Sequence, residues 1–159
     1  MNKQIIKLSK QLGQALKQQG WVMATAESCT GGGIAQAITE VPGSSVWFDR
    51  GFVTYSNQAK EEMLLVKQST LEQYGAVSEQ VAKQMVEGAL LNSHADLAVS
   101  VTGIAGPGGG SESKPVGTVY IAWGIGQLLE CHHYNFLGSR ESVRQQTVLA
   151  ALKHCLLVC

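Results

Sequence analysis

The stretch Ala24–Ile38, ATAESCTGGGIAQAI, runs from short apolar residues through four side chains of reactive or polar type into three consecutive glycines. With the residues just before it, segment 21–27 has the short apolar pattern of a strand. Segment 31–41 then has the pattern of a helix, which Pro42 and Gly43 stop. We therefore predict a strand that passes into a helix through a glycine turn.

The turn itself predicts a binding feature. The N-terminus of a helix exposes free backbone N–H groups, and glycines, which lack Cβ, let another molecule approach them closely. This geometry suits an anion, or the oxyanion that forms during acyl transfer. A tight turn in which Ser28 or Thr30 caps the helix is the structural alternative.

Helical and strand patterns alternate over the rest of the chain. Residues Ile5, Leu8, Leu12 and Leu16 have helical spacing, and segment 69–75 carries a capping-box pattern, Ser69 with Glu72. Further helices are expected over 57–66, after Ser78 and after Ser139, and further strands over 46–56, 96–103, 116–124 and 128–138. In the segments 96–103 and 116–124 the residues that would face either side of a strand are mainly apolar, as in central strands covered on both faces. The pattern predicts a single domain over residues 1–159, a three-layer α/β/α sandwich with a mixed central sheet.

Composition limits the partner. The chain of 159 residues carries 12 Lys plus Arg and 12 Asp plus Glu, with no basic run, so no nucleic-acid partner is expected. No apolar run of about 20 residues is present to cross a bilayer. The first 20 residues read as an amphipathic helix and not as a signal peptide, which predicts a cytoplasmic protein. A small-molecule substrate is therefore expected.

The cysteines and histidines give no metal-binding pattern. The four cysteines form no metal-style pair and are expected to be free thiols. His132 and His133 are adjacent in a predicted strand, so their side chains point to opposite faces. We expect neither a metal site nor a cofactor.

Three groups are candidates for chemistry. In YSNQAK, Ser56 and Lys60 are four residues apart on a helix, and Tyr55 stands at the preceding strand end, so Tyr55 and Lys60 can share one pocket. A partly desolvated lysine can take the proton of a serine, whereas a solvated helix lysine is the structural alternative. Arg140 falls in the first turn of the last helix, where a cation opposes the helix dipole unless it faces a bound anion.

The loop Gly103–Pro115 carries five glycines and two prolines. Loops of this length inside compact domains are often functional, and a surface linker is the alternative.

Five blocks of the chain resemble one family, the nicotinamide-nucleotide amidases of the CinA C-terminal domain family. The blocks are TAESCTGG (25–32), GSSVWFDRGFVTYSNQAK (43–60), GAVSEQV (75–81), VTGIAGPGGGSESKPVGTVY (101–120) and FLGSRESVR (136–144). The resemblance implies hydrolysis of the carboxamide of nicotinamide mononucleotide to nicotinate mononucleotide and ammonia, in pyridine-nucleotide recycling. No metal and no organic cofactor are implied.

The resemblance also assigns site residues. It implies Ser28 as nucleophile, Lys60 as base, Tyr55 as the group that orients Lys60 or relays its proton, and Thr102 at the same pocket. The implied substrate-binding set comprises Glu27, Cys29, Thr30, Gly31, Gly32, Gly103, Gly106, Gly109 and Arg140. Glu27 is open to two further readings, as the base itself or as a structural anchor.

Two alternatives stay open from the sequence. One is a catalytically silent nucleotide-binding module with the same pocket. The other is a cysteine hydrolase that uses Cys29, whose thiolate is favoured near a helix N-terminus. A homo-oligomer, with a dimer favoured, is expected because single-domain enzymes commonly associate symmetrically.

Overall fold

One mixed five-stranded sheet organises the chain, whose residues 2–159 are described by a computed structural model. The strands are β1 (Met23–Glu27), β2 (Phe48–Val53), β3 (Leu97–Gly103), β4 (Thr118–Ile125) and β5 (Leu128–Asn135), and the sheet order is β2-β1-β3-β4-β5. The strands β2, β1 and β3 are parallel, whereas β4 runs antiparallel to both β3 and β5. The fold is thus the predicted α/β class with a mixed sheet.

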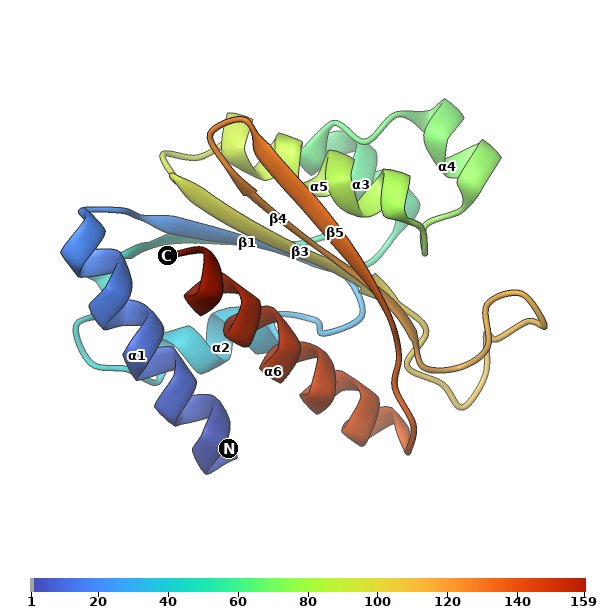
Figure 1. The fold of residues 1–159 in the computed structure, drawn as a ribbon. Helices are drawn as coiled ribbons and strands as arrows, with labels where there is room; N and C mark the ends of the chain where they lie inside the picture. Colours follow the sequence, from blue (N-terminus) through green and yellow to red (C-terminus); the bar gives the residue numbers. More distant parts are fainter. Residues whose placement is uncertain (1) are drawn as a thin grey trace.

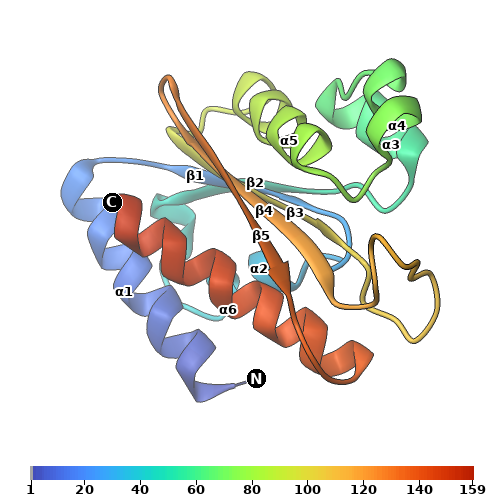
Figure 2. The same cartoon turned by 45° about the vertical axis from the view of Figure 1, so that its right-hand side comes forward.

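Helices cover both faces of this sheet (Figures 1 and 2). They are α1 (Lys3–Gln19), α2 (Gly33–Thr39), α3 (Asn57–Leu64), α4 (Gln68–Tyr74), α5 (Glu79–Leu91) and α6 (Arg140–Val158). One face carries α1, α2 and α6, and the other carries α3, α4 and α5. The strands β1 and β3 are buried over almost their whole length, because helices lie on both sides of them.

Most of the predicted elements are confirmed. Ser78 and Ser139 cap α5 and α6 with side-chain hydrogen bonds, as their positions predict. The capping box predicted for Ser69 and Glu72 is wrong, because α4 begins at Gln68 and Ser69 lies inside it. The N-terminus of α4 is held instead by Gln84 of α5, whose side chain accepts a hydrogen bond from Lys67 N at 3.0 Å.

The course of the chain places the carboxyl ends of β1 and β3 side by side. From β1 the chain crosses over through α2 to β2, and it then returns to β3 through the helices of the other face. Ligands of open α/β sheets bind at carboxyl ends where the crossovers leave in opposite directions. Within residues 2–159, no helix combines the length and the apolar character that a membrane span requires.

The position of α3 depends on a glycine of α5. A Cβ atom at Gly88 would overlap the carbonyl oxygen of Leu64, the last residue of α3. Glycine therefore lets the two helices approach backbone to backbone. This contact matters because α3 carries Lys60.

We predict that Gly88→Ala destabilises the protein. At a solvent-exposed helix position, alanine makes a protein about 1 kcal/mol more stable than glycine does. Here the overlap forces α3 and α5 apart, so we expect a net loss of stability of about 1–3 kcal/mol. Urea denaturation measures the change, with Glu87→Ala, an exposed neighbour on α5, as the control. A Gly88→Ala variant as stable as the wild type would contradict the close helix contact.

Candidate active site

The turn after β1 is fixed by backbone hydrogen bonds at its start. Ser28 N donates to Val101 O of β3 at 3.0 Å, and Gly31 N donates back to Ser28 O at 3.0 Å. Gly31 and Gly32 have φ values of +58° and +97°, in the left-handed region that glycine adopts without strain. The consecutive glycines thus serve a sharp reversal of the chain directly after Ser28.

Glu27 holds the other end of this turn. Its fully buried carboxylate accepts hydrogen bonds from the hydroxyl groups of Thr25 and Thr30, at 3.1 and 2.7 Å, and from the backbone N–H groups of Ile34 and Ala35, at 2.8 and 2.9 Å. The first turn of α2 is therefore capped by Glu27.

The side chains of this turn have structural partners, and one alternative from the sequence is wrong. The N-cap position of α2 is Gly32, so neither Ser28 nor Thr30 caps the helix with its side chain. Glu27 has the hydrogen bonds of a structural anchor, because all four of them lie within the chain. The Thr30 hydroxyl, which is also buried, is used in the same cluster.

Ser28 and Lys60 meet across the layers. Lys60 Nζ lies 3.0 Å from Ser28 Oγ and donates a second hydrogen bond to Thr54 O, also at 3.0 Å. The side chains are buried, with 9% of Ser28 and 2% of Lys60 exposed. The solvated-lysine alternative is therefore excluded.

Burial lowers the pKa of Lys60 below its ordinary value. A negative charge on Cys29 would act in the opposite sense. However, burial also raises the pKa of the Cys29 thiol to about 12, so this thiol is neutral near pH 7. The arrangement favours a neutral amine beside the Ser28 hydroxyl and disfavours a Cys29 thiolate.

Two backbone N–H groups directly after Ser28 have no partner in another residue. In the part of the chain that the structure describes, no other residue accepts a hydrogen bond from Cys29 N or Thr30 N. Arg144 of α6 donates from Nε to Cys29 O at 3.2 Å and from a terminal nitrogen to Thr30 O at 3.1 Å. Because a peptide group is planar, fixing the Cys29 carbonyl also fixes the Thr30 N–H, which points the opposite way. Arg144 thus orients a donor next to the serine.

Tyr55 is hydrogen-bonded to Arg140. The sequence had predicted that it shares a pocket with Lys60. The Tyr55 hydroxyl accepts a hydrogen bond from Arg140 at 2.9 Å, and the same guanidinium donates to Gly106 O at 2.8 Å. Lys60 has its hydrogen bonds with Ser28 and Thr54 instead, so no bond supports an orienting role for Tyr55. Tyr55 is 62% exposed and directly follows Thr54, the residue whose carbonyl binds Lys60.

The remaining predicted residues lie on β3 and the loop after it. The Thr102 hydroxyl donates to Ala76 O at 2.9 Å, which ties it to the segment before α5 and not to an open pocket. Gly103 is paired with Val119 inside the sheet, where a Cβ atom would crowd the Val119 side chain. Gly106 and Gly109 lie in the loop with positive φ values, and Gly106 contributes the carbonyl that Arg140 binds.

The sequence assigned no role to Arg144 or Thr54. Arg144 closes the FLGSRESVR block, but its partners lie more than 100 positions earlier in the chain, so local spacing gives no sign of them. Thr54 contributes a backbone carbonyl, which is independent of residue type. Its hydroxyl is the buried side-chain polar atom of residues 2–159 without a hydrogen-bond partner.

A groove of about 310 Å³ opens on the far side of the turn. It lies between α1, α2 and α6, and its lining includes Thr30 and Arg144 but neither Ser28 nor Lys60. The backbone of the turn thus separates this groove from the serine–lysine pair.

Fold and site together define an α/β/α protein with a buried hydroxyl–amine pair at a strand end, and comparison with known proteins identifies its family. The model of the CinA C-terminal domain matches residues 5–159. The chain belongs to the CinA C-terminal domain family, as the five sequence blocks predict.

Relatives of nearly equal length support the assignment. The nicotinamide-nucleotide amidohydrolase PncC of Enterobacter agglomerans is 56% identical over 156 residues, covering 97% of this chain and 94% of that protein. The protein of the same name from Escherichia coli K12 is 52% identical over 155 residues, covering 94% and 92%. The crystal structure of the competence/damage inducible protein CihA from Agrobacterium tumefaciens superposes with a TM-score of 0.97 at 46% identity, covering 99% and 97% of the two chains.

The lowered pKa of Lys60 predicts a pH-dependent contribution to stability. Unfolded, this lysine has a pKa of about 10.4, so between its folded value and about 10.4 the unfolded state binds more protons. The destabilising effect of Lys60 is therefore full below the folded value and fades as the pH rises towards 10.4. As the pH rises over this interval, the free energy of unfolding of the wild type should therefore increase relative to that of Lys60→Met.

Urea denaturation of both proteins from pH 7 to pH 10 tests this prediction. The exposed Lys10 of α1 supplies the control, because Lys10→Met should run parallel to the wild type. Parallel pH profiles for Lys60→Met and the wild type would show that the pKa of Lys60 is not lowered.

Proposed function

We propose that this chain is a nicotinamide-nucleotide amidase, which hydrolyses nicotinamide mononucleotide to nicotinate mononucleotide and ammonia. The observation that carries the proposal is the 3.0 Å contact between Lys60 Nζ and Ser28 Oγ. This contact lies in a chain more than half identical to proteins named nicotinamide-nucleotide amidohydrolase. The buried pair has the chemistry that an amide hydrolase requires.

The first half-reaction is an acyl transfer to Ser28. The neutral amine of Lys60 takes the hydroxyl proton as Ser28 Oγ attacks the carboxamide carbon. The tetrahedral intermediate then collapses, and the Lys60 ammonium returns the proton to the departing nitrogen, which leaves as ammonia. An ester between Ser28 and the nicotinoyl group remains.

The second half-reaction uses the same groups in reverse. A water molecule gives its proton to Lys60 while its oxygen attacks the ester carbon. The C–O bond to Ser28 breaks, Ser28 recovers its proton from Lys60, and the product leaves as a carboxylic acid, which loses its proton to solvent and becomes nicotinate mononucleotide. Lys60 must be neutral at the start of each half-reaction, which agrees with the direction of its pKa shift.

The free backbone donors after Ser28 supply the oxyanion site in this mechanism. The N–H groups of Cys29 and Thr30 donate to the carbonyl oxygen as it gains negative charge. Arg144 holds the peptide group that carries the Thr30 N–H, so this donor is aimed before the substrate arrives. Arg144 is a positioning residue here.

Arg140 and the glycine loop are assigned to the phosphate. The Arg140 guanidinium already bridges Tyr55 and Gly106, and it keeps further N–H groups for an anion. Backbone N–H groups at Gly106, Gly108 and Gly109 have no acceptor within the described part of the chain. These donors and Arg140 suit the ribose 5′-phosphate.

Further elements of the proposal concern the cellular setting. The chain acts in the cytoplasm on a small nucleotide, without nucleic acid or membrane, and associates as a homo-oligomer, preferably a dimer. Neither a metal nor an organic cofactor takes part in the proposed reaction, because Ser28 supplies the nucleophile, Lys60 carries the protons and the backbone donors stabilise the oxyanion.

The decisive experiment measures ammonia release from nicotinamide mononucleotide. We expect Ser28→Ala and Lys60→Arg to lose at least about 1,000-fold in kcat, because the first lacks the nucleophile and the second a deprotonable base. Cys29→Ala should keep most of the activity, since its thiol is neutral. Calorimetric binding of nicotinamide mononucleotide to Ser28→Ala checks that the site survives.

Three other outcomes each contradict a part of the proposal. A wild type that binds the nucleotide without releasing ammonia would be the silent nucleotide-binding module. A folded but inactive Cys29→Ala would identify a cysteine hydrolase. An active Lys60→Arg would show that Lys60 provides only positive charge.

Arg140→Ala should reduce the preference for phosphate. A charge-assisted hydrogen bond contributes about 1.5–3 kcal/mol, so kcat/KM for nicotinamide mononucleotide should fall about 10- to 150-fold. The value for nicotinamide riboside, which lacks the phosphate, should change little. Arg50→Ala, at an exposed arginine paired with Asp49, is the matched control. An equal fall for both substrates would place the phosphate elsewhere.

A further inference from the structure

Two histidines and a glutamate meet where β5 faces α6. Glu130 and His132 belong to β5, and His154 belongs to α6. His154 Nε2 lies 3.0 Å from Glu130 Oε2, and His132 Nε2 lies 3.9 Å from the same oxygen. One ligand atom from each of the three residues lies within 4.8 Å of the other two.

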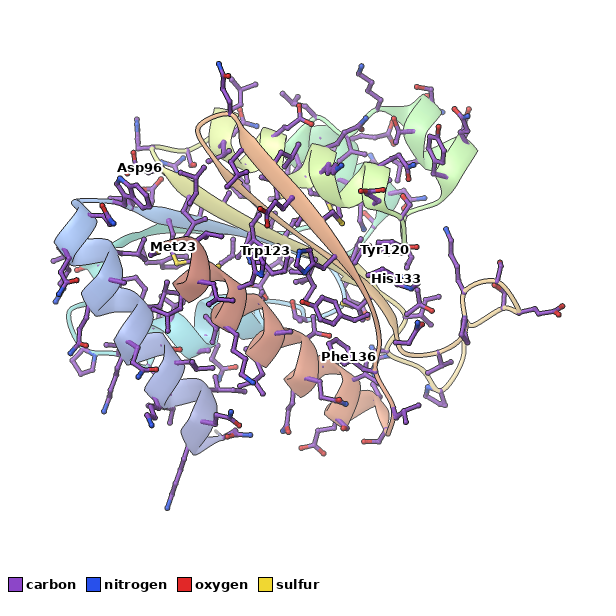
Figure 3. All side chains as sticks on the ribbon, in the orientation of Figure 1. Met23, Asp96, Tyr120, Trp123, His133 and Phe136 are labelled. Carbon is purple, nitrogen blue, oxygen red and sulfur yellow. The ribbon has the colours of Figure 1, made fainter. Side chains whose placement is uncertain are left out.

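The imidazole that lies near His132 is that of His154 and not that of its sequence neighbour His133. His132 and His133 do face opposite sides of the sheet, since His133 stacks on Tyr120 with ring centroids 4.6 Å apart (Figure 3). The second imidazole near His132 comes instead from His154, with ring centroids 4.5 Å apart. This pairing joins residues 22 positions apart, so the adjacent histidines gave no sign of it.

The donor set and its spacing fit Zn²⁺. Two imidazole nitrogens and one carboxylate oxygen form a common three-ligand zinc set, with metal–ligand distances of about 2.0–2.2 Å. A tetrahedral ion with such distances needs donor atoms about 3.3–3.6 Å apart. The measured 3.0 and 3.9 Å separations bracket this spacing, so closing the site takes shifts of less than about 1 Å at these two contacts.

The surroundings allow those shifts at the right residues. His154 is the fixed member, because its side chain is 15% exposed and lies against the Trp123 ring with centroids 3.8 Å apart. His132 and Glu130 are more mobile members, with 46% and 39% of their side chains exposed. Solvent can therefore reach the site and occupy a fourth coordination position.

The cluster is separate from the serine–lysine site. Trp123, on which His154 lies, donates to Ala151 O and so faces α6, on the side of the sheet that carries α1 and α2 (Figure 3). Lys60 approaches from α3, on the opposite side. In addition, β3 and β4 lie between β1 and β5 in the sheet.

We propose that Glu130, His132 and His154 bind one Zn²⁺ ion, which links β5 to α6 and keeps one coordination position for water. The ion replaces the His154–Glu130 hydrogen bond with metal–ligand bonds across the two elements. It has a structural effect, and the amide hydrolysis proposed above neither uses it nor depends on it.

Calorimetric titration of the chelator-treated, reduced protein with ZnCl₂ tests the site. We expect one ion per chain and, at about 100 times the dissociation constant, a rise in Tm of about 5–10 °C. His132→Ala and Glu130→Gln should each weaken binding by at least about 100-fold, because loss of an outer partner of a ligand alone costs 10- to 100-fold. His154→Ala should abolish it.

Matched controls come from the same strand. Cys131 and His133 flank His132 in sequence but face the other layer, so Cys131→Ser and His133→Ala should bind zinc as the wild type does. His132→Ala and Glu130→Gln decide the matter even where His154→Ala unfolds, because their side chains are less buried than that of His154. Absence of zinc binding to the wild type, or unchanged binding by both of these variants, would overturn the proposal.

Discussion

The buried carboxylate of Glu27 is the group on which the geometry of the candidate site depends. An unpaired charge at this depth would cost several kcal/mol, and four hydrogen bonds offset that cost. Two of the donors are the N–H groups of Ile34 and Ala35, at the helix end where the dipole favours negative charge. The end of β1 and the start of α2 are thereby joined through one side chain. The turn that carries Ser28 is therefore fixed at both ends, by the end of β1 and by the start of α2.

Lys60 reaches this turn from an element that the sheet does not hold directly. The helix α3 is positioned by its contact with α5 at Gly88, and Lys60 is then directed by the carbonyl of Thr54, the first residue after β2. The 3.0 Å contact with Ser28 Oγ therefore depends on packing between layers as well as on the turn. Burial of the lysine follows from the same packing, and with it the lowered pKa.

The sequence predicted the elements of the fold better than the partners of the site. Periodicity and capping residues located nearly every helix and strand, because these signals are local. The predictions that were wrong concern contacts between residues far apart in the sequence. Gln84 of α5, and not a Ser69 capping box, accepts the hydrogen bond at the start of α4, and Tyr55 binds Arg140, 85 positions away. The family resemblance singled out Ser28 and Lys60, and the structure brings them together, but spacing alone had paired Lys60 with Tyr55. Side-chain partners across layers are set by packing, which periodicity does not encode.

Burial has opposite consequences for the two reactive groups beside Ser28. It disfavours the charged form of each, so it raises the pKa of the Cys29 thiol and lowers that of the Lys60 amine. The thiol is thus kept in its unreactive neutral form, whereas the amine is shifted towards the neutral form that can accept a proton. An exposed turn would have the reverse effect on both groups, with a more available thiolate and a fully protonated lysine. Desolvation of the turn therefore favours serine–lysine chemistry over cysteine chemistry, although the cysteine stands next to the serine.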